Sequence, residues 1–93
     1  MKPFDWNEQK NSLLKVTRGI GFEDVVSAIN EGHLLATVDH PNAKKYPHQK
    51  IYIIVVNGYV YTVSFIDNKE SYFLKTIYPS RKYTKQFLIV KEQ

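Results

Sequence analysis

The stretch from residue 49 to residue 66, QKIYIIVVNGYVYTVSFI, decides the fold of this chain. Two runs rich in β-branched and aromatic residues flank Asn57-Gly58, and this dipeptide between such runs is the strongest short-range signal for a β-hairpin. The first run is apolar on both faces, which is typical of a strand in the middle of a sheet. The stretch therefore predicts two antiparallel strands, the first of them central.

Weaker strand signals lie on both sides of this hairpin. Residues 34–39, LLATVD, predict a short strand, and residues 40–48, HPNAKKYPH, predict a loop because two prolines and an asparagine interrupt them. After a polar turn at 67–70, residues 71–78 predict a further strand, which Pro79 ends. The sequence thus predicts a four-stranded antiparallel sheet.

Two helical patterns precede the strands. Residues 4–19, FDWNEQKNSLLKVTRG, predict a helix that Asp5 caps and Gly19 ends. Residues 22–32, FEDVVSAINEG, predict a second helix, because apolar residues recur at helical spacing and acidic residues occupy the first turn.

A short final helix is predicted from about Arg81 to Ile89, with Ser80 as its cap. The predicted order is therefore ααββββα. Two helices followed by an antiparallel meander indicate one α+β domain of two layers, covering residues 1–93.

The composition excludes several classes of protein. The chain has no cysteine, so it has no disulfides, thiolate metal sites or cysteine nucleophiles. Its first ten residues lack the apolar segment of a signal peptide, and no segment approaches the ~20 apolar residues of a membrane span. We expect a cytoplasmic protein with no membrane partner.

Positive charge is concentrated in the second half of the chain. Residues 1–40 hold four Lys/Arg and six Asp/Glu, whereas residues 41–93 hold nine and three. This asymmetry favours one face that meets an anionic partner, although ordinary solubility charge would also account for it.

The segment KTIYPSRKYTKQF, residues 75–87, gathers Arg81, Lys82 and Lys85 at the start of the final predicted helix. The helix dipole disfavours cations there, whereas free N–H groups together with side-chain cations favour a phosphate. Arg81 can grip two phosphate oxygens at once, and the two lysines act as point charges. The alternative is a solvated helix, with Lys75 guarding a sheet edge against aggregation.

The loop at 40–48 carries a second set of candidate groups. His40 and His48 at its two ends are suited to serve as general base and general acid near neutral pH. Lys44 and Lys45 can follow a phosphate backbone while Tyr46 stacks on a base. The alternative is a solvated loop. The sequence has no HExxH motif and no tight His/Asp cluster, so it predicts neither a metal site nor a cofactor.

In order and length, the assembled pattern resembles the BrnT family of toxins, which belong to the RelE-like ribonuclease toxins of type II toxin–antitoxin systems. FDWNEQKNS is similar to the family's opening motif, RGIGFEDVVSAI to its following helix, and LKTIYPSRKYTKQF to its closing strand and helix. Thr17-Arg18 stands where the family has Lys-His.

The resemblance implies a small basic endoribonuclease that cleaves mRNA and forms a hetero-oligomer with a cognate antitoxin. It also implies that Arg81 and Lys82 belong to the active surface. We expect Arg81 to hold the charge of the phosphorane, with His40 and then His48 as base or acid and Glu23 as a weaker candidate.

The remaining predicted roles concern RNA binding. Contacts to RNA are expected from Lys44, Lys45, Tyr46, Lys75, Tyr83 and Lys85. The main rival is a module that binds RNA or DNA without cleaving it, or a degenerate toxin that binds only its antitoxin. A second rival is a structural partner protein whose basic face matches an acidic chain.

Overall fold

The turn at Asn57-Gly58 forms as the sequence predicts. Both residues have positive φ, 52° and 76°, as a type I′ turn requires. The turn sets the register of the two long strands on either side, so that Val56 faces Tyr59. This hairpin is the centre of the sheet.

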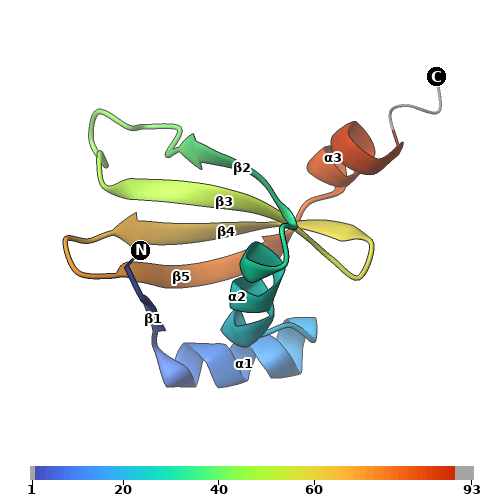
Figure 1. Cartoon of the computed structure of the whole chain (residues 1–93), viewed down its shortest axis with the longest axis horizontal. Helices are drawn as coiled ribbons and strands as arrows, with labels where there is room; N and C mark the ends of the chain where they lie inside the picture. Colours follow the sequence, from blue (N-terminus) through green and yellow to red (C-terminus); the bar gives the residue numbers. More distant parts are fainter. Residues whose placement is uncertain (1, 90–93) are drawn as a thin grey trace.

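A computed structural model describes residues 2–89. The elements in chain order are β1 (Phe4–Trp6), α1 (Glu8–Arg18), α2 (Phe22–Asn30), β2 (Leu34–Asp39), β3 (Gln49–Val56), β4 (Tyr59–Asp67), β5 (Tyr72–Pro79) and α3 (Arg81–Thr84), which continues as a π-helical turn, η1 (Lys85–Ile89) (Figure 1). No helix in this part of the chain is long and apolar enough to cross a membrane.

The sheet differs from the predicted one. It is mixed and has five strands in the order β1-β5-β4-β3-β2, so the prediction of four antiparallel strands in the order ααββββα is wrong. The additional strand, β1, pairs parallel to β5. Three residues are too few to show strand periodicity, and the sequence pattern therefore merged them with the helix that follows.

The predicted cap of the first helix, Asp5, is wrong for the same reason. Asp5 lies within β1, and the cap is Asn7, two residues later, whose side chain accepts a hydrogen bond of 2.9 Å from the Lys10 N–H. Two predicted caps are correct, because Gly19 ends α1 with a φ of 71° and the Ser80 side chain caps α3.

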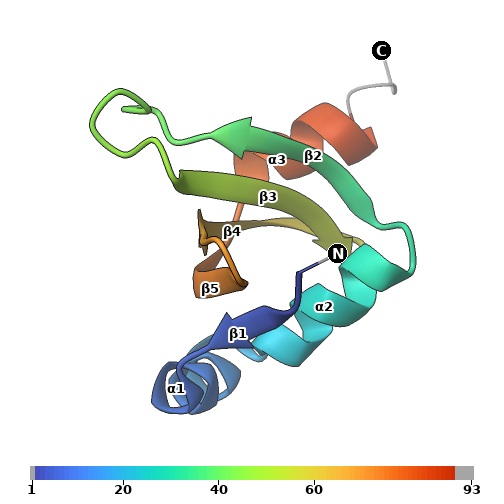
Figure 2. The same ribbon diagram turned by 60° about the vertical axis from the view of Figure 1, so that its left-hand side comes forward.

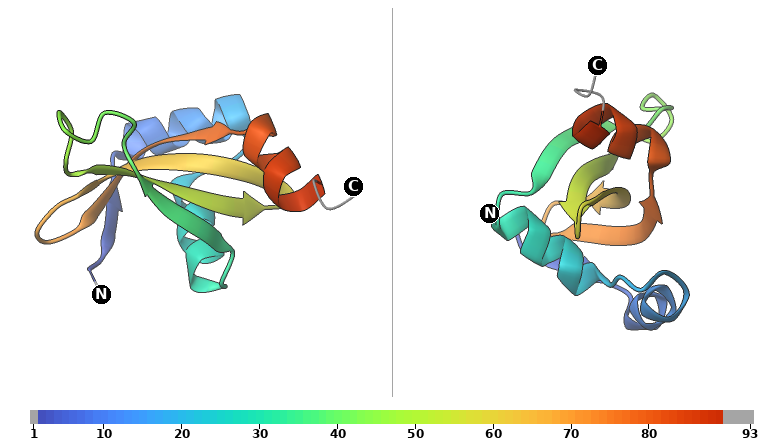
Figure 3. Two further views of the ribbon diagram at one scale, coloured as in Figure 1. Left: turned by 90° about the horizontal axis from the view of Figure 1, so that it is seen from above. Right: turned by 90° about the vertical axis from the view of Figure 1, so that its right-hand side faces the viewer.

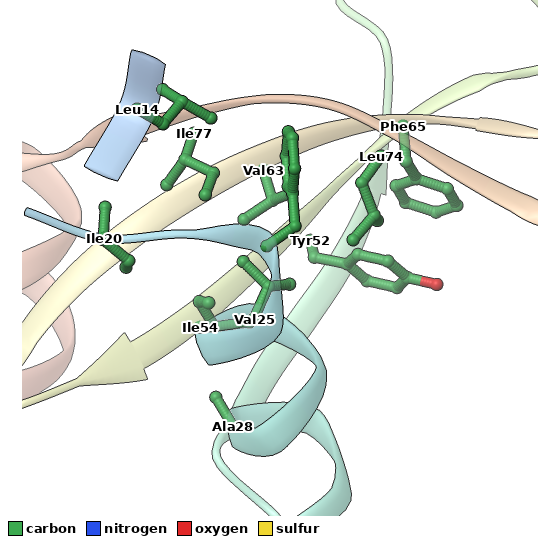
Figure 4. Close-up of a cluster of buried hydrophobic side chains, with 11 residues drawn as sticks. Leu14, Ile20, Val25, Ala28, Tyr52, Ile54, Val63, Phe65, Leu74 and Ile77 are labelled. Atoms are coloured by element: carbon green, nitrogen blue, oxygen red, sulfur yellow. The ribbon is translucent and has the colours of Figure 1, made fainter. Parts of the chain in front are cut away.

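One face of the sheet packs against α1 and α2 (Figures 1 and 2). The core between these layers is apolar, and Figure 4 shows side chains from both helices meeting those of three strands. Its buried residues are Leu14, Ile20, Phe22, Val25, Ala28, Tyr52, Ile54, Val63, Phe65, Leu74 and Ile77. The ring of Phe4 packs on Tyr52, and that of Trp6 packs on Phe22, so β1 also contributes to the core.

Asn11 joins the two N-terminal helices. Its side chain is 1% exposed, its Oδ1 accepts a 2.7 Å hydrogen bond from the Phe22 N–H, and its Nδ2 donates to both Glu23 carboxylate oxygens at 3.0 Å. One buried amide therefore fixes where α2 starts relative to α1.

The opposite face of the sheet is here called the open face. Among residues 2–89, only α3 covers it, and it does so at one end (Figure 3). The Ser80 N–H donates to the Val60 carbonyl at 2.9 Å, and the Thr84 hydroxyl accepts from the Val60 N–H at 2.9 Å. These bonds anchor α3 to the start of β4, and Val60 is completely buried.

Candidate nucleic-acid interface

The cations of the last helix stand on a fixed turn of backbone. Arg81, Lys82 and Lys85 are exposed, while the buried Thr84 holds the turn to β4. The α-helical part has four residues, and the Ser80 hydroxyl already accepts from the Tyr83 N–H at 3.1 Å. Attraction for an anion therefore has to come mainly from the three cationic side chains rather than from free helix N–H groups.

The segment that carries these cations has no acidic residue of its own. Residues 71–89 contain no Asp or Glu. Within the described residues, the salt bridges join Lys2 to Asp67, Lys15 to Glu23 and Lys50 to Asp39, and none involves a cation of α3 or η1. Because no salt bridge of residues 2–89 involves these cations, they form a positive surface in this part of the chain.

Arg18 reaches the same end of β5 from a different part of the chain. From the end of α1 its Nε donates to the Ile77 carbonyl at 3.0 Å, and its guanidinium lies 4.6 Å from the ring centre of Tyr78. Tyr78 is 51% exposed. We call Arg18, Tyr78, Arg81, Lys82 and Lys85 the cationic end.

Sequence reasoning missed Arg18 and Tyr78. A basic residue in the last turn of a helix is ordinary, since it matches the helix dipole, and it therefore drew no attention. For Tyr78, its position beside Pro79, which ends the strand, was the signal that the sequence offered.

An open groove runs along β5 beside the cationic end. It has a volume of about 550 Å³ and is lined by Asn7, Lys10, Ser64, Phe73, Leu74, Lys75, Thr76 and Tyr78. Lys75, a predicted RNA contact, therefore lies on the same strand as the cationic end. Lys10 was not predicted, because its place in the N-terminal helix gave no reason to put it near β5.

The loop between β2 and β3 lies at the other end of the sheet (Figure 1). The His40 N–H donates to the Gln49 carbonyl at 3.2 Å, and the His48 carbonyl accepts from the Asp67 N–H at 2.8 Å. Asp67 ends β4, whereas α3 is bonded to Val60 near the start of β4. A strand of nine residues at about 3.3 Å per residue separates the two ends by roughly 25 Å.

The structure therefore does not bring the predicted catalytic residues together. Arg81 and Lys82 lie at one end of β4, and His40 and His48 lie at the other. A histidine at the loop cannot exchange a proton with an atom that Arg81 holds, because proton transfer requires hydrogen-bond distance.

The loop is a separate basic patch with its own order. His40 Nδ1 accepts from the Asn42 N–H at 2.9 Å, and its ring lies 4.7 Å from that of Tyr46. Lys45 Nζ lies 5.4 Å from the centre of the same tyrosine ring, and Lys44 is exposed. This arrangement is suited to contact an anion or a base at a distance from the cationic end.

Glu23, the weaker candidate base, is held in a structural role. Hydrogen bonds from Asn11, then from its own backbone and from Lys15, outweigh desolvation and lower the pKa of this carboxyl. It belongs to α2, on the face of the sheet opposite α3 (Figure 3).

Residues 2–89 contain no group of three or more His, Asp or Glu side chains arranged to hold a metal ion. No protein-family model, curated protein or solved structure matches this chain.

Proposed function

We propose that this chain is the toxin of a type II toxin–antitoxin system, and that it binds mRNA with the open face and cleaves it at the cationic end. The proposal rests on one observation above the others. Arg18, Arg81, Lys82 and Lys85 gather at one end of the sheet, on anchored backbone, and the salt bridges among the described residues leave all four without a carboxylate. The resemblance to BrnT toxins in sequence order supplies the reaction.

RNA can be cut by its own 2′-OH, which attacks the adjacent phosphorus and leaves a 2′,3′-cyclic phosphate. A base takes the proton from the 2′-OH, cations hold the charge of the phosphorane, and an acid protonates the departing 5′-oxygen. In the proposal Arg81 holds the phosphorane, because its planar guanidinium can bind two oxygens at once. Lys82 and Lys85 hold the flanking phosphates.

The acid and the base then have to come from the cationic end. Tyr78 and Tyr83 are proton-carrying side chains of this region. His40 and His48 have no part in proton transfer in this scheme, because roughly 25 Å of β4 separates them from Arg81. The loop instead contacts RNA away from the cut, through Lys44, Lys45 and Tyr46.

In the same proposal the protein acts in the cytoplasm, where mRNA is translated, and a cognate antitoxin neutralises it. An acidic segment of the antitoxin would match the cationic end for the same electrostatic reason as RNA.

Binding without cleavage is the second candidate. It is favoured by the separation of His40 and His48 from Arg81, which removes the strongest acid–base pair of the sequence from the cationic end. On this alternative the chain is an RNA-binding module or a degenerate toxin.

Pulsed expression followed by mapping of RNA ends in the cells separates the two candidates. The wild type should create new RNA ends and stop growth, and Arg81→Ala should lose about 10²–10³ in cleavage rate, which is typical when one electrostatic donor is removed. Lys69→Ala, which removes an equal charge from the turn between β4 and β5, should cleave like the wild type.

A double variant, His40→Ala with His48→Ala, tests where the chemistry takes place. Cleavage should continue, with the same ends mapped. Its complete loss in a folded protein would show that the loop carries the reaction and would overturn the assignment to the cationic end. Intact RNA in cells that make folded wild type would leave the binding module as the function.

A further inference from the structure

The groove along β5 forms where β1 stops. β1 pairs with β5 only from Tyr72 to Leu74, after which the chain turns away at Asn7 into α1. α1 then runs along β5, and at its end Arg18 bonds to the Ile77 carbonyl. Between these two points the outer edge of β5 has no strand beside it among the described residues, and the hollow opens there.

The lining of the groove combines three kinds of group. Lys10 and Lys75 supply positive charge from two different elements, and the salt bridges of residues 2–89 include neither of them. Phe73 and Tyr78 supply aromatic rings. Cations that can track phosphates, together with rings on which bases can stack, are the chemistry of single-strand binding.

Hydroxyl groups complete the lining. Ser64 and Thr76 belong to it, and the Thr76 hydroxyl oxygen is buried without a hydrogen-bond partner. Such a buried hydroxyl costs free energy, and it lies beneath the surface of the groove.

We propose that this groove is a subsite for single-stranded RNA, which holds the nucleotides next to the bond at the cationic end. Lys10 and Lys75 bind two phosphates, and the rings of Phe73 and Tyr78 receive unpaired bases. The inference rests on the proposed function, because the strand that enters the groove is the one whose phosphate Arg81 holds.

A peptide strand paired with the β5 edge is the less favoured occupant. The free edge is short, and Arg18 already occupies the Ile77 carbonyl that a further strand would need. The backbone of a neutral peptide also offers no anionic group to the two lysines. An acidic peptide remains a distinct outcome of the test below.

The salt dependence of RNA binding tests the inference directly. The probe is a fluorescein-labelled single-stranded RNA of about 15 nucleotides, a length within the site sizes of single-strand binders. Its affinity would be measured by anisotropy over a series of salt concentrations. Each phosphate contact to a single strand adds about 0.7 to the slope of log Kd against log salt concentration.

The variants are Lys10→Gln and Lys75→Gln, singly and together, which remove charge while keeping most of the side chain. The double variant should lower the slope by roughly 1.4, and each single variant by about half of that. Lys69→Gln is the control with an equal loss of charge and should lower the slope less than either. Far-UV circular dichroism establishes that each variant is folded.

Each outcome decides between the occupants. An unchanged slope in the folded double variant would show that RNA does not enter the groove, while the loss of cleavage in Arg81→Ala would still support the proposed function. Binding of a polyglutamate peptide that depends on both lysines, with an unchanged RNA slope, would assign the groove to an acidic peptide and overturn the inference. If the wild type binds no RNA at all, the proposed function and the inference both fail.

Discussion

Replacing Asn11 by alanine should destabilise this fold more than any other single polar truncation in α1. The buried amide makes three hydrogen bonds at the start of α2, one to the Phe22 N–H and two to the Glu23 carboxylate. Alanine leaves the Phe22 N–H without a partner in a residue that is 0% exposed. It also leaves a small hole between the helices.

The size of the effect follows from these contacts. An unsatisfied buried N–H costs about 1–3 kcal/mol, which is the main contribution. The bonds to Glu23 add less than a buried charged pair would, because the Glu23 side chain is 52% exposed and water screens it. We expect a total loss of about 2–4 kcal/mol, which for a domain of this size lowers the melting temperature by roughly 8–32 °C.

Thermal and urea unfolding followed by circular dichroism measure this loss. Ser12→Ala is the matched control, because the neighbouring side chain is exposed and its removal should leave the melting temperature nearly unchanged. A melting temperature of Asn11→Ala within about 3 °C of the wild type would refute the view that this amide fixes α2 to α1.

The pH dependence of stability tests the contact between Asn11 and Glu23 a second time. The pKa of Glu23 is lowered in the folded chain, chiefly by the Asn11 hydrogen bond, so the folded state is favoured above the unfolded pKa and loses this stability as the pH falls through the folded pKa. In Asn11→Ala the loss of stability below about pH 4.5 should therefore be smaller than in the wild type.

Two further predictions concern other parts of the fold. Thr84→Val keeps the shape of the side chain but removes two hydrogen bonds, the one that the hydroxyl accepts from the Val60 N–H and the 2.7 Å bond that it donates to the Ser80 carbonyl. The free energy of unfolding should therefore fall by about 1–3 kcal/mol. An unchanged urea midpoint would contradict the anchoring of α3. Burial is the main cause that raises the pKa of Tyr52 to about 12, and the negative charges of Tyr72 and Asp67 add to it. Since the unfolded tyrosine ionises near pH 10, stability should fall as the pH rises from about 10 to about 12, and one of the seven tyrosines should ionise late in a spectrophotometric titration. A single ionisation step near pH 10 for all seven would show that this ring is exposed.

The sequence was sufficient for the parts of the fold that local signals define. The hairpin at Asn57-Gly58 and the end of α1 at Gly19 need positive φ, which few residues adopt without cost, and both were predicted. The cap of α3 at Ser80 was predicted for a similar local reason. These features depend on a few neighbouring residues.

What the sequence could not supply was contact between distant segments. β1 exists because Phe4 and Trp6 pack into a core made by later residues and because β5 supplies its hydrogen-bonding partner. A three-residue strand has no periodicity of its own, so the local pattern favoured a helix that starts too early. The same limit applies to the surface, where Arg18 and Lys10 reach β5 only because α1 lies along it.

The separation of the candidate catalytic groups shows a second limit. His40, His48 and Arg81 were grouped by their chemistry, and chemistry alone carries no information about position. Their distance is set by the length of β4, because the loop is bonded at one of its ends and α3 near the other. Knowledge of the strand pairing was needed to see this.

The pairing of β1 with β5 also has a consequence for how the chain reaches its final shape. The ion pair of Lys2 with Asp67 joins residues 65 positions apart, and β5 is the last strand among the described residues. Such non-local contacts form only after a long loop closes, so we expect the hairpin to form early and the β1–β5 edge late. Because Arg81 follows β5 directly, the cationic end takes its final shape in that late step. A chain still on the ribosome therefore contains these cations before they are arranged together, and the proposed affinity for RNA phosphates arises only when synthesis has passed β5.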